Sequence, residues 1–83
     1  MFSLIYYFDV WGNQEDGWEV NDQTTVINNL NIPSNISNEE LINKLIDMDY
    51  LSNENVRVEW YSDMMCEIFS SANDKPLYGL IRN

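Results

Sequence analysis

The stretch of residues 3–11 limits most strongly what this chain can fold into. Apolar side chains fill both alternating sets of positions there, and nearly all are aromatic or β-branched: Leu4, Tyr6, Phe8 and Val10 in one set, Ile5, Tyr7 and Trp11 in the other. Such residues over this length favour a β-strand that is buried on at least one side. The stretch therefore predicts a strand in the interior of a sheet.

A β-hairpin is predicted directly after this strand. Residues 12–17 are rich in glycine, asparagine and acidic residues, which break the strand pattern, and the pattern resumes at residues 18–20. This arrangement is typical of two antiparallel strands joined by a turn. We expect the second strand to continue towards Leu30, with a bulge near Asn21 and Asp22.

A capping box marks the start of a helix. The Ser37 hydroxyl can accept a hydrogen bond from the Glu40 amide, while the Glu40 carboxylate reaches back to the Ser37 amide. Apolar side chains then recur at helical spacing, at Leu41, Ile42, Leu45, Ile46 and Met48. The segment therefore predicts one amphipathic helix of about three turns that covers the sheet.

The remaining sequence predicts three further strands. Apolar and polar residues alternate over residues 56–61 and again over residues 64–70, and a last short strand is expected over residues 77–81. A chain of 83 residues is too short to divide into two units with a core each. We expect one α+β domain over residues 1–83, with an antiparallel sheet of about five strands packed against a single helix in the order β-β-α-β-β-β.

The residue types argue against catalysis. The chain has no histidine, which removes the usual general base, the common nucleophile pairs and imidazole metal ligands. Cys66 is the only cysteine and lies in a strand pattern. A cysteine in such a pattern is more often a small core residue than a nucleophile. We therefore expect no enzymatic activity, no cofactor and no metal site.

The charge of the chain is strongly negative and unevenly distributed. It has 14 acidic residues and 4 lysines and arginines, which gives a net charge of −10, and no lysine or arginine precedes residue 44. Such a surface repels phosphate groups, so we expect neither direct binding to nucleic acid nor binding to an anionic membrane. A basic protein surface is the natural partner.

Residues 9–22, which we call the acidic hairpin, hold five carboxylates and two tryptophans. The candidate partner-binding residues are Asp9, Trp11, Glu15, Asp16, Trp18, Glu19 and Asp22. Tryptophan supplies much of the energy of protein interfaces, and a negative patch steers a basic partner. We expect an acidic rim around Trp11 and Trp18 on one face, with a place in the core as the favoured alternative for Trp18.

Calcium binding by the acidic hairpin is a less favoured alternative. Calcium prefers oxygen ligands of the kind that this segment offers. However, if Gly17 is taken as the invariant glycine of an EF-hand, the first ligand position falls on Gly12 and the third on Gln14. A solvated acidic hairpin agrees better with the spacing.

Two motifs in the acidic hairpin carry a resemblance. Asp9-Val10-Trp11-Gly12-Asn13 and Asp16-Gly17-Trp18-Glu19-Val20-Asn21-Asp22 are similar to the opening of small uncharacterised proteins carried by phages and mobile elements of Gram-positive bacteria, and those proteins also end near a counterpart of Pro76-Leu77-Tyr78. The resemblance implies a phage or prophage setting. Many small acidic phage proteins inhibit host defence or transcription, so it also implies a binding function, but it assigns no role to an individual residue.

These observations lead to two functional hypotheses. The first is a non-enzymatic binding module whose acidic hairpin imitates nucleic acid and blocks a basic surface of a nucleic-acid-handling protein. The alternative is a small structural or assembly protein that forms a homo-oligomer, for example a homodimer, in which the acids maintain solubility. We expect a cytoplasmic location, because no apolar run reaches the roughly 18 residues that a membrane span needs and the start lacks the basic segment of a secretory signal.

Overall fold

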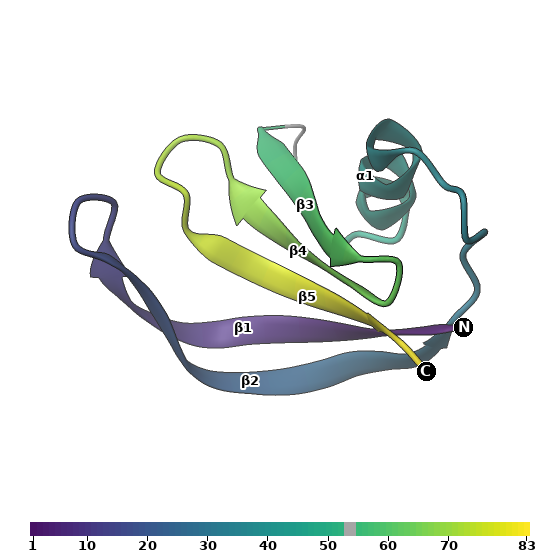
Figure 1. Cartoon of the computed structure of the whole chain (residues 1–83), viewed down its shortest axis with the longest axis horizontal. Coiled ribbons are helices and arrows are strands. Elements are labelled where there is room, and N and C mark those ends of the chain that lie inside the picture. The colour runs from purple at the N-terminus through teal and green to yellow at the C-terminus, as the bar shows by residue number, and fades with distance from the viewer. Residues whose placement is uncertain (53–54) are drawn as a thin grey trace.

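The described residues, 1–52 and 55–83 of a computed structural model, form five strands and one helix (Figure 1). The strands make one antiparallel sheet in the order β2-β1-β5-β4-β3. The bounds of the elements are β1 (Phe2–Asn13), β2 (Gly17–Leu30), α1 (Asn38–Asp47), β3 (Val56–Ser62), β4 (Met65–Ser70) and β5 (Pro76–Arg82). The predicted α+β architecture and element order are thereby confirmed.

The helix α1 begins at the predicted cap. The Ser37 Oγ accepts a hydrogen bond of 3.1 Å from the Glu40 amide, and it donates one of 3.0 Å to the Glu40 carboxylate. The carboxylate therefore bonds the serine hydroxyl and not the serine amide that the capping box predicts. Leu41 and Leu45 on the inner side of α1 are fully buried, and each such leucine stabilises the fold by about 1.5–3 kcal/mol.

The core lies between α1 and one face of the sheet. Because side chains alternate between the two faces of a strand, Leu4, Ile68 and Leu80 all point towards α1, with Leu4 paired directly to Leu80 across β1 and β5. Cys66 is fully buried in the same cluster, which confirms the expectation that it is a core residue.

The middle of the opposite face of the sheet is covered by a tyrosine side chain and not by a helix. Tyr7 is only 7% exposed there, because its ring crosses Gly79 on β5 and its hydroxyl donates a hydrogen bond of 2.7 Å to Glu67 on β4. A Cβ atom at position 79 would collide with the Tyr7 hydroxyl oxygen. Glycine at this position therefore lets one tyrosine cover the middle of the sheet.

The strands β1 and β2 extend beyond the rest of the sheet. β5 pairs with β1 only from Phe2 to Tyr6, and further along β1 has only β2 as its neighbour. In Figure 1 the tip of this hairpin lies at the opposite end of the molecule from α1 and from both termini. The acidic hairpin is thus a two-stranded ribbon that projects from the packed part of the fold.

The predicted bulge and turn of this ribbon are both present. Asp9 pairs with Asp22 and Val10 pairs with Val20, so Asn21 is the extra residue, as expected. At the tip, Gly17 follows a three-residue turn. Its φ of 95° is a backbone conformation that favours glycine. This turn fixes which residues of the two strands face each other.

Candidate binding surface

One face of the acidic hairpin gathers Trp11 and three carboxylates. Trp11 pairs across the strands with Glu19, and Asp9 pairs with Asp22, and directly paired residues project from the same face. The Trp11 indole donates a hydrogen bond of 2.7 Å to Asp9 and so joins the two pairs. Trp11 remains 63% exposed. The face therefore combines an open indole surface with clustered negative charge.

The two remaining acids of the hairpin lie at its tip. Glu15 and Asp16 are both exposed. Asp16 is held by Asn13, whose amide side chain donates to the Asp16 carboxylate at 3.1 Å and whose side-chain oxygen accepts from the Asp16 backbone amide at 2.7 Å. These bonds order the tip without removing its charge.

The carboxylates of the hairpin are not neutralised by cations. In the part of the chain that the structure describes, ion pairs link Arg57 to Glu59 at 3.4 Å and to Asp74 at 3.1 Å, and none involves the hairpin. Arg82 instead lies over the ring of Phe2, with 4.9 Å from its guanidinium carbon to the ring centroid. The five carboxylates therefore act on solvent and on approaching molecules as unpaired charges.

Trp18 lies on the other face of the hairpin from Trp11. It pairs with Gly12, the neighbour of Trp11, so the two indoles project in opposite directions. Its indole donates a hydrogen bond of 2.8 Å to the carbonyl oxygen of Asn73 in the β4–β5 connection. This corrects the expectation that both tryptophans share one face. Trp18 is half-buried and is not part of the hydrophobic core, so the alternative of a core position is corrected as well.

A row of four aromatic rings continues from the hairpin across the sheet. The ring centroids are 6.5 Å apart between Phe8 and Tyr6, 5.3 Å between Tyr6 and Tyr78, and 6.4 Å between Tyr78 and Tyr50. Phe8 is 51% exposed and Tyr6 is 40% exposed, whereas Ile5 and Tyr7 of the other alternating set are buried. Tyr6 is the last residue of β1 that pairs with β5, and Phe8 lies beyond it on the projecting part of the strand.

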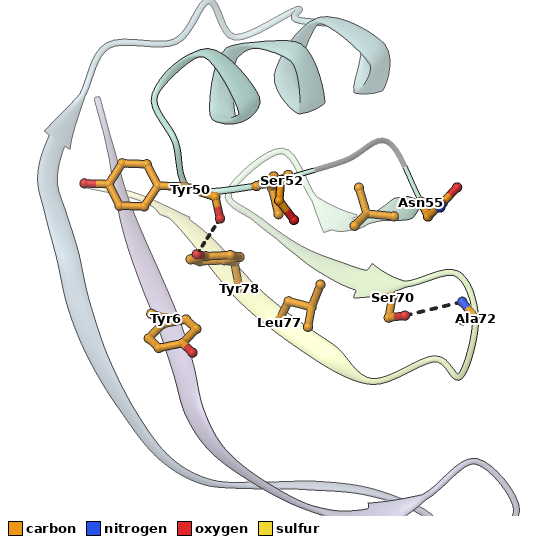
Figure 2. A pocket seen from close by; sticks show the side chains of 10 residues that line it. Tyr6, Tyr50, Ser52, Asn55, Ser70, Ala72, Leu77 and Tyr78 are labelled. Atoms are coloured by element: carbon orange, nitrogen blue, oxygen red, sulfur yellow. Dashed lines mark hydrogen bonds between the residues drawn. The ribbon is translucent and has the colours of Figure 1, made fainter.

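A pocket of about 460 Å³ opens beside this row (Figure 2). Tyr6, Tyr50 and Tyr78 line one side, and residues of β4 and the β4–β5 connection line the other, among them Ser70 and Ala72. The described lining residues include no aspartate, glutamate, lysine or arginine. Among these described residues there are no converging carboxylates of the kind that glycoside hydrolysis would need.

Two tyrosines share one carboxylate on the opposite face of the sheet. Tyr7 and Tyr61 each donate a hydrogen bond of 2.7 Å to a different oxygen of Glu67. The hydrogen bond to Glu67 and partial burial raise the pKa of Tyr61 to about 12, and burial together with Glu67 raises the pKa of Tyr7 still further. Both phenols therefore stay protonated at neutral pH and act as donors that hold β1, β3 and β4 together.

No protein-family model, no curated protein and no solved structure matches this chain. Within residues 1–52 and 55–83, no helix has both the length and the apolar character needed to cross a membrane.

Metal binding and thiol chemistry find no support in the geometry. Among the described residues, no three cysteine, aspartate or glutamate side chains lie close enough together to hold a metal ion. Burial raises the pKa of the Cys66 thiol to about 12, so it is a poor nucleophile at neutral pH. The acidic hairpin and the aromatic row are the two surface features left to explain.

Proposed function

We propose that this chain is a non-enzymatic binding module whose acidic hairpin occupies a basic surface of a nucleic-acid-handling protein. The observation that carries the proposal is that five carboxylates lie on a ribbon that projects beyond the sheet, and that no lysine or arginine side chain in the described part of the chain forms an ion pair with them. A charge cluster of this kind costs stability through self-repulsion, and attraction to a basic partner relieves it.

The geometry of the ribbon supports the comparison with nucleic acid. Asp9, Asp22 and Glu19 lie along one face of the ribbon and Glu15 and Asp16 lie at its tip, so negative charges follow its length as they follow a phosphate backbone. The exposed indole of Trp11 adds an aromatic anchor among the carboxylates that it faces. The phage setting that the sequence resemblance implies agrees with an inhibitor of a host protein.

Affinity capture from a bacterial lysate tests this proposal. The bait is compared with a variant in which Glu15→Gln, Asp16→Asn, Glu19→Gln and Asp22→Asn remove four charges from the hairpin. A matched control removes four exposed charges elsewhere, through Glu39→Gln, Asp47→Asn, Asp49→Asn and Asp63→Asn. We expect the parent chain and the control to retain the same nucleic-acid-binding protein, and the hairpin variant to lose it. Retention by all three, or by none, contradicts the proposal.

A homo-oligomer is the second candidate, and one observation favours it. β2 lies at the edge of the sheet, and its residues 23–30 carry no charge. An uncharged edge strand can pair with the same strand of a second copy. Light scattering during size-exclusion chromatography separates the two candidates, because a stable dimer supports assembly and a monomer excludes it.

A further inference from the structure

The aromatic pocket lies close to the acidic hairpin. Tyr6 in its wall lies three residues before Asp9 on β1. Ala72 on the other side precedes Asn73, whose carbonyl oxygen accepts the hydrogen bond from Trp18 of the hairpin. One wall of the pocket is therefore continuous with the hairpin along β1, and the connection beside the other wall is hydrogen-bonded to the hairpin.

One wall of the pocket is aromatic, and a hydrogen bond joins two of its tyrosines. The Tyr78 hydroxyl donates a hydrogen bond of 2.7 Å to the backbone oxygen of Tyr50, as the dashed line in Figure 2 marks. The Tyr50 and Tyr78 rings meet edge to face at 85°, and Tyr6 packs on Tyr78 at a tilt of 40°. Ring faces are electron-rich and attract cations, and quaternary or guanidinium groups bind in such aromatic surroundings.

The uncharged lining of the pocket and the negative charge of the hairpin beside it favour a cationic side chain as the occupant. The described lining residues carry no ionised group, so they neither repel nor neutralise an incoming charge, and the adjacent hairpin attracts cations. A guanidinium group is planar and weakly hydrated and stacks on aromatic rings, whereas an ammonium group is compact and strongly hydrated. A pocket of about 460 Å³ is ample for one such side chain.

We infer that this pocket receives an arginine side chain of the basic partner, stacked on the tyrosines, while the acidic hairpin binds neighbouring basic residues. The inference rests on the proposed function, since it names the residue that the partner inserts. The tyrosine rings supply the stacking surface, and the hydroxyl oxygens of Ser52 and Tyr6 are acceptors within the lining for the guanidinium N–H groups.

The test is an NMR titration of the full chain with a capped Gly-Arg-Gly peptide and with its citrulline analogue. Citrulline has the shape of arginine without the charge. We expect arginine to shift the resonances of Tyr6, Tyr50 and Tyr78, and to bind about threefold or more tightly than citrulline. Equal affinity of the two peptides, or shifts confined to the acidic hairpin, would overturn the inference.

Two variants separate this inference from the proposed function. Tyr6→Leu should weaken arginine binding at the pocket about threefold or more, while Tyr61→Leu, an exposed tyrosine on the opposite face, should leave it unchanged. Unchanged binding by Tyr6→Leu refutes the pocket even where the hairpin variant has lost its partner. If the arginine peptide binds the pocket of the parent chain but the hairpin variant still captures the partner, the hairpin proposal is refuted instead.

Discussion

The indole of Trp18 donates a hydrogen bond of 2.8 Å to the carbonyl oxygen of Asn73, 55 residues further along the chain. Trp18 lies near the tip of the projecting hairpin, and Asn73 lies in the connection between β4 and β5. This bond links the hairpin to the β4–β5 connection, and it gives an otherwise two-stranded ribbon a third point of support.

The first prediction concerns this bond. Trp18→Phe keeps an aromatic ring but removes the donor, so we expect the free energy of unfolding to fall by about 1 kcal/mol. Hydrogen exchange at the amides of residues 17–20 should also become faster. The control is Trp11→Phe, which removes a solvent-exposed hydrogen bond to Asp9 within the hairpin and should alter stability by less than about 0.5 kcal/mol, because water replaces the exposed partner. Equal effects of the two changes in urea unfolding would contradict this role of Trp18.

The second prediction concerns Gly79. Gly79→Ala places a methyl group against the Tyr7 hydroxyl, and we expect a loss of about 1–3 kcal/mol in urea unfolding. Adding Tyr7→Phe removes the nearest atom of the collision, so the double variant should lose less than the sum of the two single variants. Strict additivity would mean that the two positions do not interact.

The third prediction concerns pH. The pKa of Tyr61 is raised from 10.0 to about 12, and that of Tyr7 is raised as well. Because the folded-state values lie above the unfolded ones, the stability that these phenols contribute is fully present below pH 10. It is lost as the pH rises from about 10 through 12 and beyond.

Absorbance titration of the tyrosines measures this effect. Glu67→Gln removes the charge that both phenols face, so the pKa of Tyr61 should fall towards 10, while Asp63→Asn should leave it unchanged. A Tyr61 pKa that is insensitive to Glu67→Gln would show that the negative charge of Glu67 is not the cause.

The fourth prediction concerns Cys66. Its side chain is fully buried and burial raises its pKa to about 12, so a thiol reagent at neutral pH should modify the native chain only as fast as the chain opens. In concentrated urea the reaction should be complete at once. Rapid modification under native conditions would contradict the core position.

The local features of the fold were predictable because neighbouring residues determine them. The Ser37 cap, the burial of Leu41 and Leu45, and the bulge at Asn21 all follow from patterns within a few residues. The strand order was not predictable in this way. Insertion of β5 beside β1 depends on contacts between residues some 70 positions apart, such as Leu4 and Leu80, and no local pattern encodes them.

The candidate surface was predictable in part. The acidic hairpin and its exposed carboxylates follow from the sequence, but the faces of Trp11 and Trp18 depend on the length of the turn. Pairing of Asn13 with Gly17 sets the register, and a one-residue difference would have put both indoles elsewhere. The pocket was missed because Tyr50 and Tyr78 meet only through the tertiary fold.

The most direct test of the acidic hairpin as a binding surface is a calorimetric titration of the captured partner, purified, with the parent chain at about 50 mM and about 500 mM NaCl. The account predicts that the affinity drops about tenfold or more at the higher salt concentration, and that the four hairpin substitutions remove most of this dependence. Equal affinity at both salt concentrations, or an unchanged salt dependence in the hairpin variant, would contradict it.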